Sequence, residues 1–298
     1  MSGRSSRNNA LHLEGEQTDV KLALFNDYQL GVVQDGKIYD IGKLLFPEWK
    51  PACPMVELVR NYDSYRTSIE TQYAACQAYN LEDVRLRQPV AQPGKIVAAP
   101  VNYLSHKKEM NVLHTARGLG FFLKAPSSII GPGDAIQLPA TKRGRRFDHE
   151  LELAFVIGKK AKHVKAEDAH QYIFGFTGLN DVTLRPDADN EEERCLRKSF
   201  DTFTPMGPWI TTVEDIPDFN NVDMVLTVNG EVRQRVNTKD MVCGIAELVE
   251  IYSHVMTLEP GDIIATGTPD GVAPIHAGDR VTIEIAHIGS FSNPVIAD

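Results

Sequence analysis

The chain has 298 residues, of which 42% are hydrophobic and 24% charged, and its formal net charge is −9 at pH 7. That composition is ordinary for a soluble globular enzyme made of one large domain, with or without a small companion. The negative charge argues against a nucleic-acid-binding surface, and no apolar run approaches the roughly 20 residues of a membrane-spanning helix.

The N-terminus and the cysteines both favour a cytoplasmic protein. Residues 1–19 are polar and lack the apolar core of a signal peptide, so we expect a flexible arm. Four scattered cysteines form no Cys-x-x-Cys pair, which is typical of a reduced, cytoplasmic protein rather than a disulfide scaffold or a zinc site. These cysteines are Cys53, Cys76, Cys195 and Cys243.

A small N-terminal α/β domain is predicted over residues 20–90. Turn-forming residues separate its short β-type runs, and prolines precede its helical runs. A linker-like stretch at 84–90, followed by Pro93-Gly94, closes this part, so the main domain is expected over residues 91–298. The predicted elements are β-type runs at 20–25, 29–33 and 37–41 and helices at 55–60 and 65–79.

The main domain is predicted to be rich in β-structure. A Gly-Asp pair precedes an apolar β-like run three times, and Asn229-Gly230 joins the two strands of the clearest hairpin. Helices are expected at 166–172 and 244–256. The predicted strands are 96–99, 173–179, 222–228, 231–236, 263–265 and 281–288.

Residues 147–158 are predicted to form an acidic strand. Side chains alternate across a strand, so Asp148, Glu150 and Glu152 share one face while apolar residues occupy the other. Adjacent unpaired carboxylates are costly in a folded core, and a hard divalent cation with oxygen ligands would compensate them. The alternative is a wet strand edge with solvated or arginine-paired glutamates.

His106 and Glu109 lie three residues apart in a short predicted helix with Ser105 as its N-cap. On a helix they share a face, and a carboxylate that holds an imidazole makes it a better general base. The alternative is an exposed polar pair on a surface helix. Glycines 118 and 120 follow, so the segment 103–120 could hinge as a lid.

Other polar segments are ambiguous from the sequence alone. Lys198 precedes a turn-rich, aromatic segment and is either functional or an ordinary surface lysine. The basic turn at 142–146 is either solvated or a contact for an anionic substrate, and the acidic run at 191–193 is most simply a solvated loop. Residues 266–272 form a glycine-rich loop with two threonines, which could approach a carboxylate or phosphate.

In combination, six separated pieces between Lys95 and the C-terminus resemble the fumarylacetoacetate hydrolase family. They occur in the family's order and span roughly two-thirds of the chain. The pieces are Asn102-Tyr103 with His106 and Glu109, Phe122-x-Lys124, Glu150-x-Glu152, Asn180-Asp181-Val182-Thr183 with Arg185, Lys198 to Phe203, and Gly261 to Pro269.

The resemblance implies an α+β, β-rich fold: a rolled mixed β-sheet main domain with a small N-terminal α/β domain, assembled as a homodimer. It implies Mg²⁺, or Mn²⁺, with Ca²⁺ as a substitute in crystals, held by Glu150, Glu152 and Asp181. Asp148 would make only supporting contacts. The remaining implied roles are His106 and Glu109 as the water-activating dyad, Lys198 as the stabiliser of developing negative charge, and Tyr103, Lys124, Arg185 and Thr268 as substrate-binding residues.

The implied activity is hydrolysis of a C–C bond in a small 2,4-dioxo acid, an acylpyruvate or fumarylpyruvate-like compound. Decarboxylation of an oxaloacetate-type acid, hydration of an oxo-enoate and isomerisation of a dienol in aromatic catabolism use the same enolate chemistry and stay open. A catalytically silent binding protein is a third alternative. Two turns depart from the family pattern, at Ala98 to Val101 and at Leu184 to Asp187, and either could reshape the pocket.

Overall fold

The computed structural model describes residues 20–48 and 50–298, so the expected arm at 1–19 lies outside the described residues. Its strands are β1 (Lys21–Phe25), β2 (Gln29–Gln34), β3 (Lys37–Asp40), β4 (Ala78–Asn80), β5 (Ile96–Ala98), β6 (Phe122–Lys124), β7 (Ile129–Ile130), β8 (Ile136–Leu138), β9 (Phe147–Asp148), β10 (Leu151–Ile157), β11 (Ile173–Asn180), β12 (Thr183–Leu184), β13 (Thr204–Thr212), β14 (Asp223–Val228), β15 (Glu231–Asn237), β16 (Ile263–Ala265), β17 (Arg280–Ile285) and β18 (Gly289–Ala297). The α-helices are α1 (Gly42–Leu45), α2 (Pro54–Arg60), α3 (Tyr62–Gln72), α4 (Leu104–Glu109), α5 (Ala116–Leu119), α6 (Arg194–Arg197) and α7 (Ile245–Val255).

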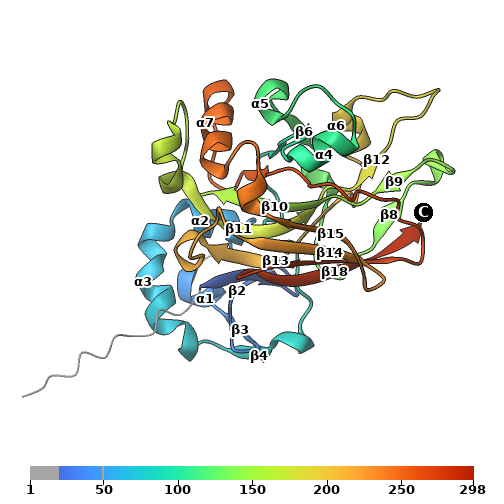
Figure 1. Ribbon diagram of the computed structural model, residues 1–298. Coiled ribbons are helices and arrows are strands. Elements are labelled where there is room, and N and C mark those ends of the chain that lie inside the picture. Colours follow the sequence, from blue (N-terminus) through green and yellow to red (C-terminus); the bar gives the residue numbers. More distant parts are fainter. Residues whose placement is uncertain (1–19, 49) are drawn as a thin grey trace, which may run out of the picture.

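Two large mixed sheets enclose the main core (Figure 1). The larger has the order β4-β3-β2-β1-β13-β11-β10-β16-β5-β6, with β7 beside β13, and the smaller has the order β15-β14-β17-β18-β8. Apolar side chains of both sheets, such as Phe155, Phe176, Leu226 and Phe291, belong to one buried cluster. This arrangement confirms the expected β-rich α+β fold with a rolled mixed sheet.

Two glycines allow the sheets to approach closely. Gly178 of β11 and Gly207 of β13 are register partners. A Cβ atom on Gly178 would lie 2.8 Å from the Phe291 ring of β18, which is closer than real Cβ atoms come to their neighbours. Glycine is therefore required where the β18 side chains press against the larger sheet.

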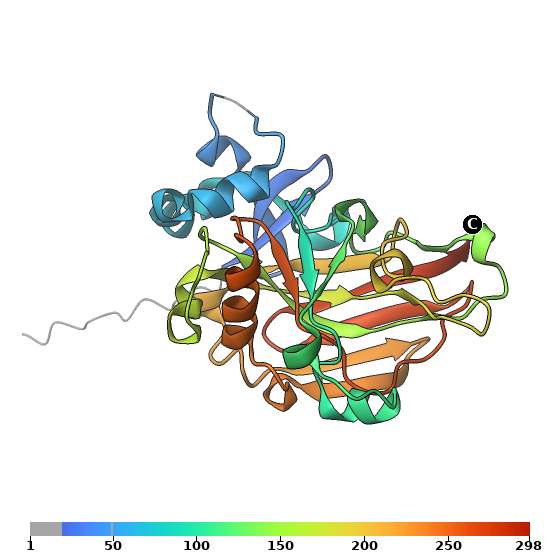
Figure 2. The ribbon, with the colours of Figure 1, turned by 90° about the horizontal axis from the view of Figure 1, so that it is seen from above.

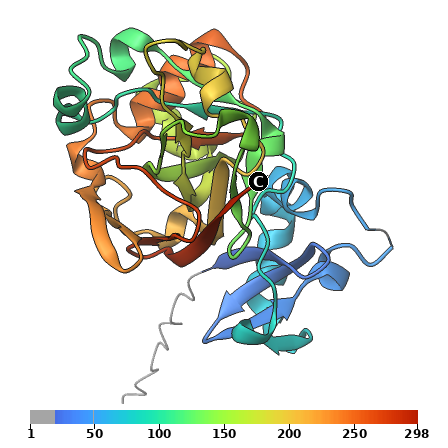
Figure 3. The same ribbon diagram turned by 90° about the vertical axis from the view of Figure 1, so that its right-hand side faces the viewer.

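The N-terminal elements extend the larger sheet, because β1 pairs antiparallel with β13. A second buried cluster joins residues of both parts, including Leu22, Leu58, Val156 and Ile263. Figure 3 shows the N-terminal elements, in blue, gathered at one side of the molecule, and Figure 2 shows α1–α3 from above. The division into domains of 20–90 and 91–298 stays a prediction.

Most predicted elements are present, and the 222–236 hairpin turns at Asn229 and Gly230 with φ of 53° and 83°. Some boundaries were wrong. The predicted strand 281–288 ends at Ile285, as β17. The second predicted helix ends as α3 at Gln72, and Ala78–Asn80 pairs as β4. The acidic strand is interrupted at residues 149–150, between β9 and β10.

Ser105 is not the N-cap of α4, because that helix begins one residue earlier and Tyr103 occupies the cap position. The stretch from Lys198 to Trp209 was expected to be turn-rich, but its second half belongs to β13, despite two prolines. Within residues 20–48 and 50–298, no helix is both long and apolar enough to cross a membrane.

Candidate active site

The site lies at one end of the central strands of the larger sheet, where several of these strands begin or end together. β10 runs antiparallel to both β11 and β16, so its first residues lie beside the last residues of those two strands. β5 runs parallel to β16 and ends at the same edge. The register pairs Leu151 with Asn180, which places Glu150 and Glu152 next to Asp181.

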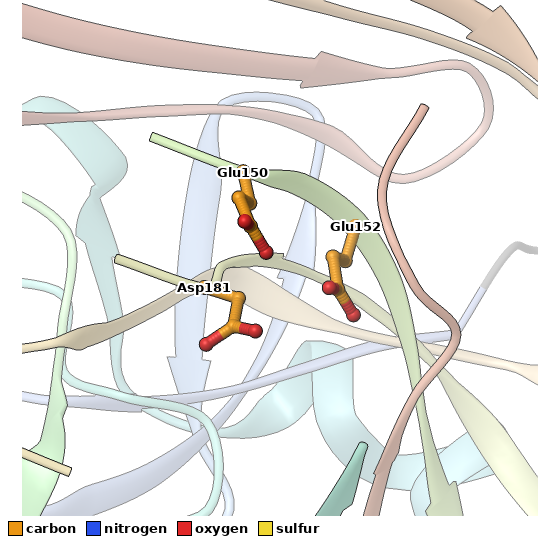
Figure 4. A group of neighbouring side chains, drawn as sticks. All are labelled: Glu150, Glu152 and Asp181. Carbon is orange, nitrogen blue, oxygen red and sulfur yellow. The ribbon is translucent and has the colours of Figure 1, made fainter. Parts of the chain in front are cut away.

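Glu150, Glu152 and Asp181 form a buried acidic cluster, and one carboxylate oxygen from each lies within 4.8 Å of the others. Figure 4 shows the three carboxylates pointing toward one another from two neighbouring segments. Backbone hydrogen bonds fix the pair of segments, since the Asp181 amide donates to the Glu150 carbonyl at 2.9 Å.

Cations surround the acidic cluster. The Lys198 ammonium donates to Glu150 at 2.7 Å and to Asp181 at 2.5 Å, and Arg185 donates to the other oxygen of Glu150 at 2.6 Å. Lys124, fully buried, donates to the second oxygen of Asp181 at 2.6 Å. Each of these cations therefore contacts a carboxylate of the predicted metal site.

The two glutamates differ in their charge balance. Burial raises the pKa of Glu150, but the positive charges of Lys198 and Arg185, with His106 nearby, lower it well below its usual range. Burial and the negative charge of Asp181 raise the pKa of Glu152 well above its usual range. Glu152 is thus the glutamate whose negative charge the surrounding cations compensate less.

This donor set fits a hard divalent cation. Carboxylate oxygens are the ligands that Mg²⁺ and Mn²⁺ prefer, and three of them converge here. The insufficient compensation of Glu152 is what an added positive charge would relieve. Asp148 stands outside the cluster and pairs with Arg146 at 2.7 Å and Arg185 at 2.7 Å. Its expected role, supporting contacts only, stays a prediction.

His106 and Glu109 form a hydrogen-bonded pair on α4, with 2.9 Å between Nδ1 and a carboxylate oxygen. The other carboxylate oxygen of Glu109 accepts from the Gly271 amide at 2.9 Å, which anchors α4 to the glycine-rich loop. Nε2 of His106 has no partner within the described residues, and the ring lines the cavity of the acidic cluster. The expected closure of 103–120 over a substrate stays a prediction.

The glycine-rich loop carries Thr268 into the cavity wall. Its hydroxyl oxygen accepts a hydrogen bond from Gln234 at 2.9 Å, while Gly267 donates its amide to Glu152 at 2.8 Å. Gly267 has a φ of 91°, and a Cβ atom there would lie 2.8 Å from Asn102. Sequence reasoning missed Gln234, a buried residue whose only sequence signal is its place on the hairpin.

The cavity of the acidic cluster measures about 120 Å³. It is lined by charged and apolar side chains together, which suits a small polar metabolite. Its lining includes the acidic cluster, an apolar part with Pro100, Val101 and Val112 (the apolar wall) and a basic part with Arg194 and Arg197 (the basic wall). Sequence reasoning missed these two arginines, because their run of acidic neighbours resembles a solvated loop.

Two predicted substrate-binding residues lie behind the cavity wall. Tyr103 is 1% exposed, and its hydroxyl has no partner within the described part of the chain. Lys124 donates to Asp181 and to two backbone carbonyls. Substrate contact stays a prediction for both. By contrast, Arg185 and Thr268 line the cavity directly.

The basic turn and the acidic run pair with each other. Lys142 and Arg145 both donate to Glu192, and these hydrogen bonds lower the pKa of Glu192 to about 2. The predicted solvated loop is therefore wrong for Glu192. The turn from Ala98 to Val101, which departs from the family pattern, is strained. Val101 has a φ of 51°, a conformation that a β-branched residue adopts only at a cost.

Comparison with known proteins agrees with this geometry. The model of the fumarylacetoacetate hydrolase C-terminal family matches residues 95–296. Maleylpyruvate hydrolase of Aquipseudomonas alcaligenes is 40% identical over 287 residues, covering 92% of this chain and 98% of that protein. A mitochondrial oxaloacetate tautomerase of Xenopus laevis is 40% identical over 223 residues, covering 72% of this chain and 69% of that protein.

A solved structure is similar over nearly the whole chain. It is maleylpyruvate hydrolase from Sphingobium sp. SYK-6, in complex with manganese(II) and pyruvate. The TM-score is 0.83 at 40% identity, with 93% of this chain and 99% of that chain covered. The fold, the matched residues and these similarities lead to one conclusion: the chain belongs to the fumarylacetoacetate hydrolase family.

Proposed function

We propose that this protein is a metal-dependent hydrolase that cleaves a C–C bond in a small 2,4-dioxo acid, an acylpyruvate or fumarylpyruvate-like compound. The observation that carries the proposal is the hydrogen-bonded His106–Glu109 pair, whose histidine lines the same cavity as the three clustered carboxylates. The relatives named maleylpyruvate hydrolase support it, because they match over more than nine-tenths of the chain.

Glu150, Glu152 and Asp181 would hold the divalent ion, which when bound supplies Lewis-acid polarisation of a 2-oxo carboxylate. Manganese is supported by the similar structure that contains manganese(II). Magnesium is proposed from the oxygen-only donor set, since it is the hard cation that such sites usually take.

The remaining steps follow from the chain's own residues. His106 accepts a proton from water through Nε2, and the water oxygen attacks the distal carbonyl carbon. The bond between C3 and C4 breaks, its electron pair forms the enolate of pyruvate, and the proton returns from His106 to C3. Glu109 fixes the imidazole through Nδ1, and the Lys198 ammonium stabilises the negative charge.

Thr268 is suited to hold the substrate's head carboxylate. Its oxygen already accepts from Gln234, so its own hydrogen is available to a second acceptor in the cavity. The products of the complete reaction are pyruvate and a carboxylic acid, with one water consumed.

The second candidate is keto–enol tautomerisation or another proton-transfer reaction of a 2-oxo acid. The relative named oxaloacetate tautomerase favours it. Such a reaction uses His106 as a proton carrier but needs no attacking water, so the two functions share residues and differ in their products. A silent binding protein is disfavoured by the intact dyad, lysine and carboxylate cluster.

The test is a substrate panel with Mn²⁺ or Mg²⁺, containing maleylpyruvate, fumarylpyruvate, acetylpyruvate and oxaloacetate, with products identified by NMR. We expect pyruvate and the matching acid from at least one 2,4-dioxo acid. Turnover of oxaloacetate with none of any acylpyruvate would replace the hydrolase with the second candidate.

We also propose a cytoplasmic homodimer. The cytoplasmic location is supported by the cysteines, all four of which are free. The homodimer rests on the family resemblance, and light scattering coupled to size-exclusion chromatography tests it.

A further inference from the structure

The basic wall of the cavity carries positive charge that is not paired with the carboxylates of the acidic cluster. Arg194 and Arg197 stand at the two ends of α6, three residues apart, and both line the cavity. The next residue, Lys198, donates to Glu150 and Asp181, so α6 leads directly into the predicted metal site.

These two arginines differ from the other cations nearby. Arg185 is neutralised by Asp148 and Glu150, at 2.7 and 2.6 Å. Arg197 donates only to the backbone carbonyls of Glu192 and Leu184, at 2.9 and 3.2 Å. It is therefore held in place without a carboxylate partner among the described residues.

Arg194 also lacks a carboxylate partner within that part of the chain. Its guanidinium carbon lies 5.6 Å from the centre of the Phe122 ring, and the Lys198 ammonium lies 5.1 Å from the same centre. Burial, followed by the positive charges of Arg185 and Arg194, lowers the pKa of Arg197. The basic wall thus carries two half-buried guanidinium groups in mutual repulsion, an arrangement that an added anion would relieve.

We propose that Arg194 and Arg197 bind the second carboxylate of the substrate, so that the enzyme prefers 2,4-dioxo dicarboxylates to acylpyruvates with a neutral tail. This inference rests on the proposed function, because it places the 2-oxo carboxylate head at the acidic cluster. The carbon chain then lies along the apolar wall, and the distal carboxylate meets the basic wall. A planar guanidinium presents paired donors that match the two oxygens of a carboxylate.

The kinetic test compares maleylpyruvate with acetylpyruvate in the wild type, Arg194→Gln and Arg197→Gln. Each substitution is expected to lower kcat/KM for maleylpyruvate by about 10- to 100-fold, mainly through KM, because it removes a charged hydrogen bond. Hydrolysis of acetylpyruvate should change by less than about 3-fold. Arg197→Lys should recover part of the loss, since it keeps the charge.

Arg143→Gln is the matched control. Arg143 is likewise an arginine without a carboxylate partner in the described chain, but it is exposed and lines a different cavity. Its substitution should leave both substrates unaffected. An equal loss for the two substrates in the Arg194 and Arg197 variants would show a merely structural role and overturn the proposal, as would no loss for either.

Equilibrium binding separates this inference from the proposed function. Calorimetry of the Mn²⁺-loaded protein compares 2-oxoadipate with 2-oxohexanoate, which has the same chain length but lacks the second carboxylate. The wild type should bind 2-oxoadipate about 10-fold or more tightly, and the two Gln variants should lose that preference. Equal binding by the wild type would overturn the inference even if acylpyruvates are hydrolysed. A preference lost in the variants would sustain it even if no acylpyruvate is hydrolysed.

Discussion

Glutamine substitutions at Glu150 and Glu152 are expected to change the stability of the metal-free protein in opposite directions. Glu150 accepts from Lys198 at 2.7 Å and from Arg185 at 2.6 Å, and both cations are nearly buried. Breaking a buried ion pair costs about 3–5 kcal/mol. Both cations keep a second carboxylate, Asp181 or Asp148, so Glu150→Gln should cost about 3 kcal/mol, at the lower end of that range.

For Glu152 the sign is reversed. Its folded-state pKa is raised, so the folded carboxyl keeps a proton that the unfolded chain has already released. The stability of the wild type therefore falls as pH rises from about 4.5 toward the folded pKa, by about 1.4 kcal/mol per pH unit. Glutamine has no proton to lose. Glu152→Gln should thus be more stable than the wild type near neutral pH, while Gly267 still donates to the side-chain oxygen.

The assay is calorimetric unfolding in EDTA at about pH 7.5. For a chain of 298 residues, about 3 kcal/mol corresponds to a fall of roughly 5 °C in Tm for Glu150→Gln. Glu152→Gln should have a higher Tm than the wild type, and the advantage should shrink at about pH 5. A similar loss of stability in both variants would refute the charge balance assigned to the cluster.

Four further outcomes are expected. Because the pKa of Glu152 is raised, a metal ion must displace a proton from it, so the Kd for Mn²⁺ should fall by up to about tenfold per pH unit as the pH rises. A Kd that calorimetry finds independent of pH would contradict this. His106→Ala should lower acylpyruvate hydrolysis by at least about 10²-fold with Mn²⁺ affinity nearly unchanged, whereas any oxaloacetate turnover that needs no attacking water should fall less. Glu109→Gln should show a milder hydrolytic defect in the same assay, because the imidazole loses its charged partner but remains. Val101→Gly should raise the free energy of unfolding by about 1 kcal/mol in denaturant titrations, since relief of a positive φ outweighs the added chain entropy; a loss of stability would count against the strain.

The acidic cluster was predictable in part. Strand alternation placed Glu150 and Glu152 on one face, but the contact with Asp181 depends on the register that pairs Leu151 with Asn180. No local pattern encodes that register. The family resemblance, and not a local pattern, identified Asp181 as the third predicted metal ligand. The His106–Glu109 hydrogen bond, by contrast, follows from helical spacing alone, although Ser105 was assigned the wrong place in the helix.

Charged runs were predicted less well, because their partners lie far away in the sequence. Lys142 and Arg145 suggested either a solvated turn or an anion contact, and Glu192 suggested a solvated loop. Each is in fact the counterion of the other, about 50 residues away in sequence. A charge pattern within one segment cannot show whether a segment distant in the sequence neutralises it.

The distribution of the site along the chain has a consequence for specificity. The dyad and two of the three carboxylates come from α4 and the start of β10, and strand register or a hydrogen bond to the glycine-rich loop fixes each of them. The basic wall comes instead from the long connection between β12 and β13, which contains α6 and contributes Arg194 and Arg197. Unlike Lys198, Arg194 and Arg197 contact none of the three carboxylates, so these two positions can change in sequence without removing a contact to the acidic cluster. The tail of the substrate can therefore change while the chemistry at its head is kept.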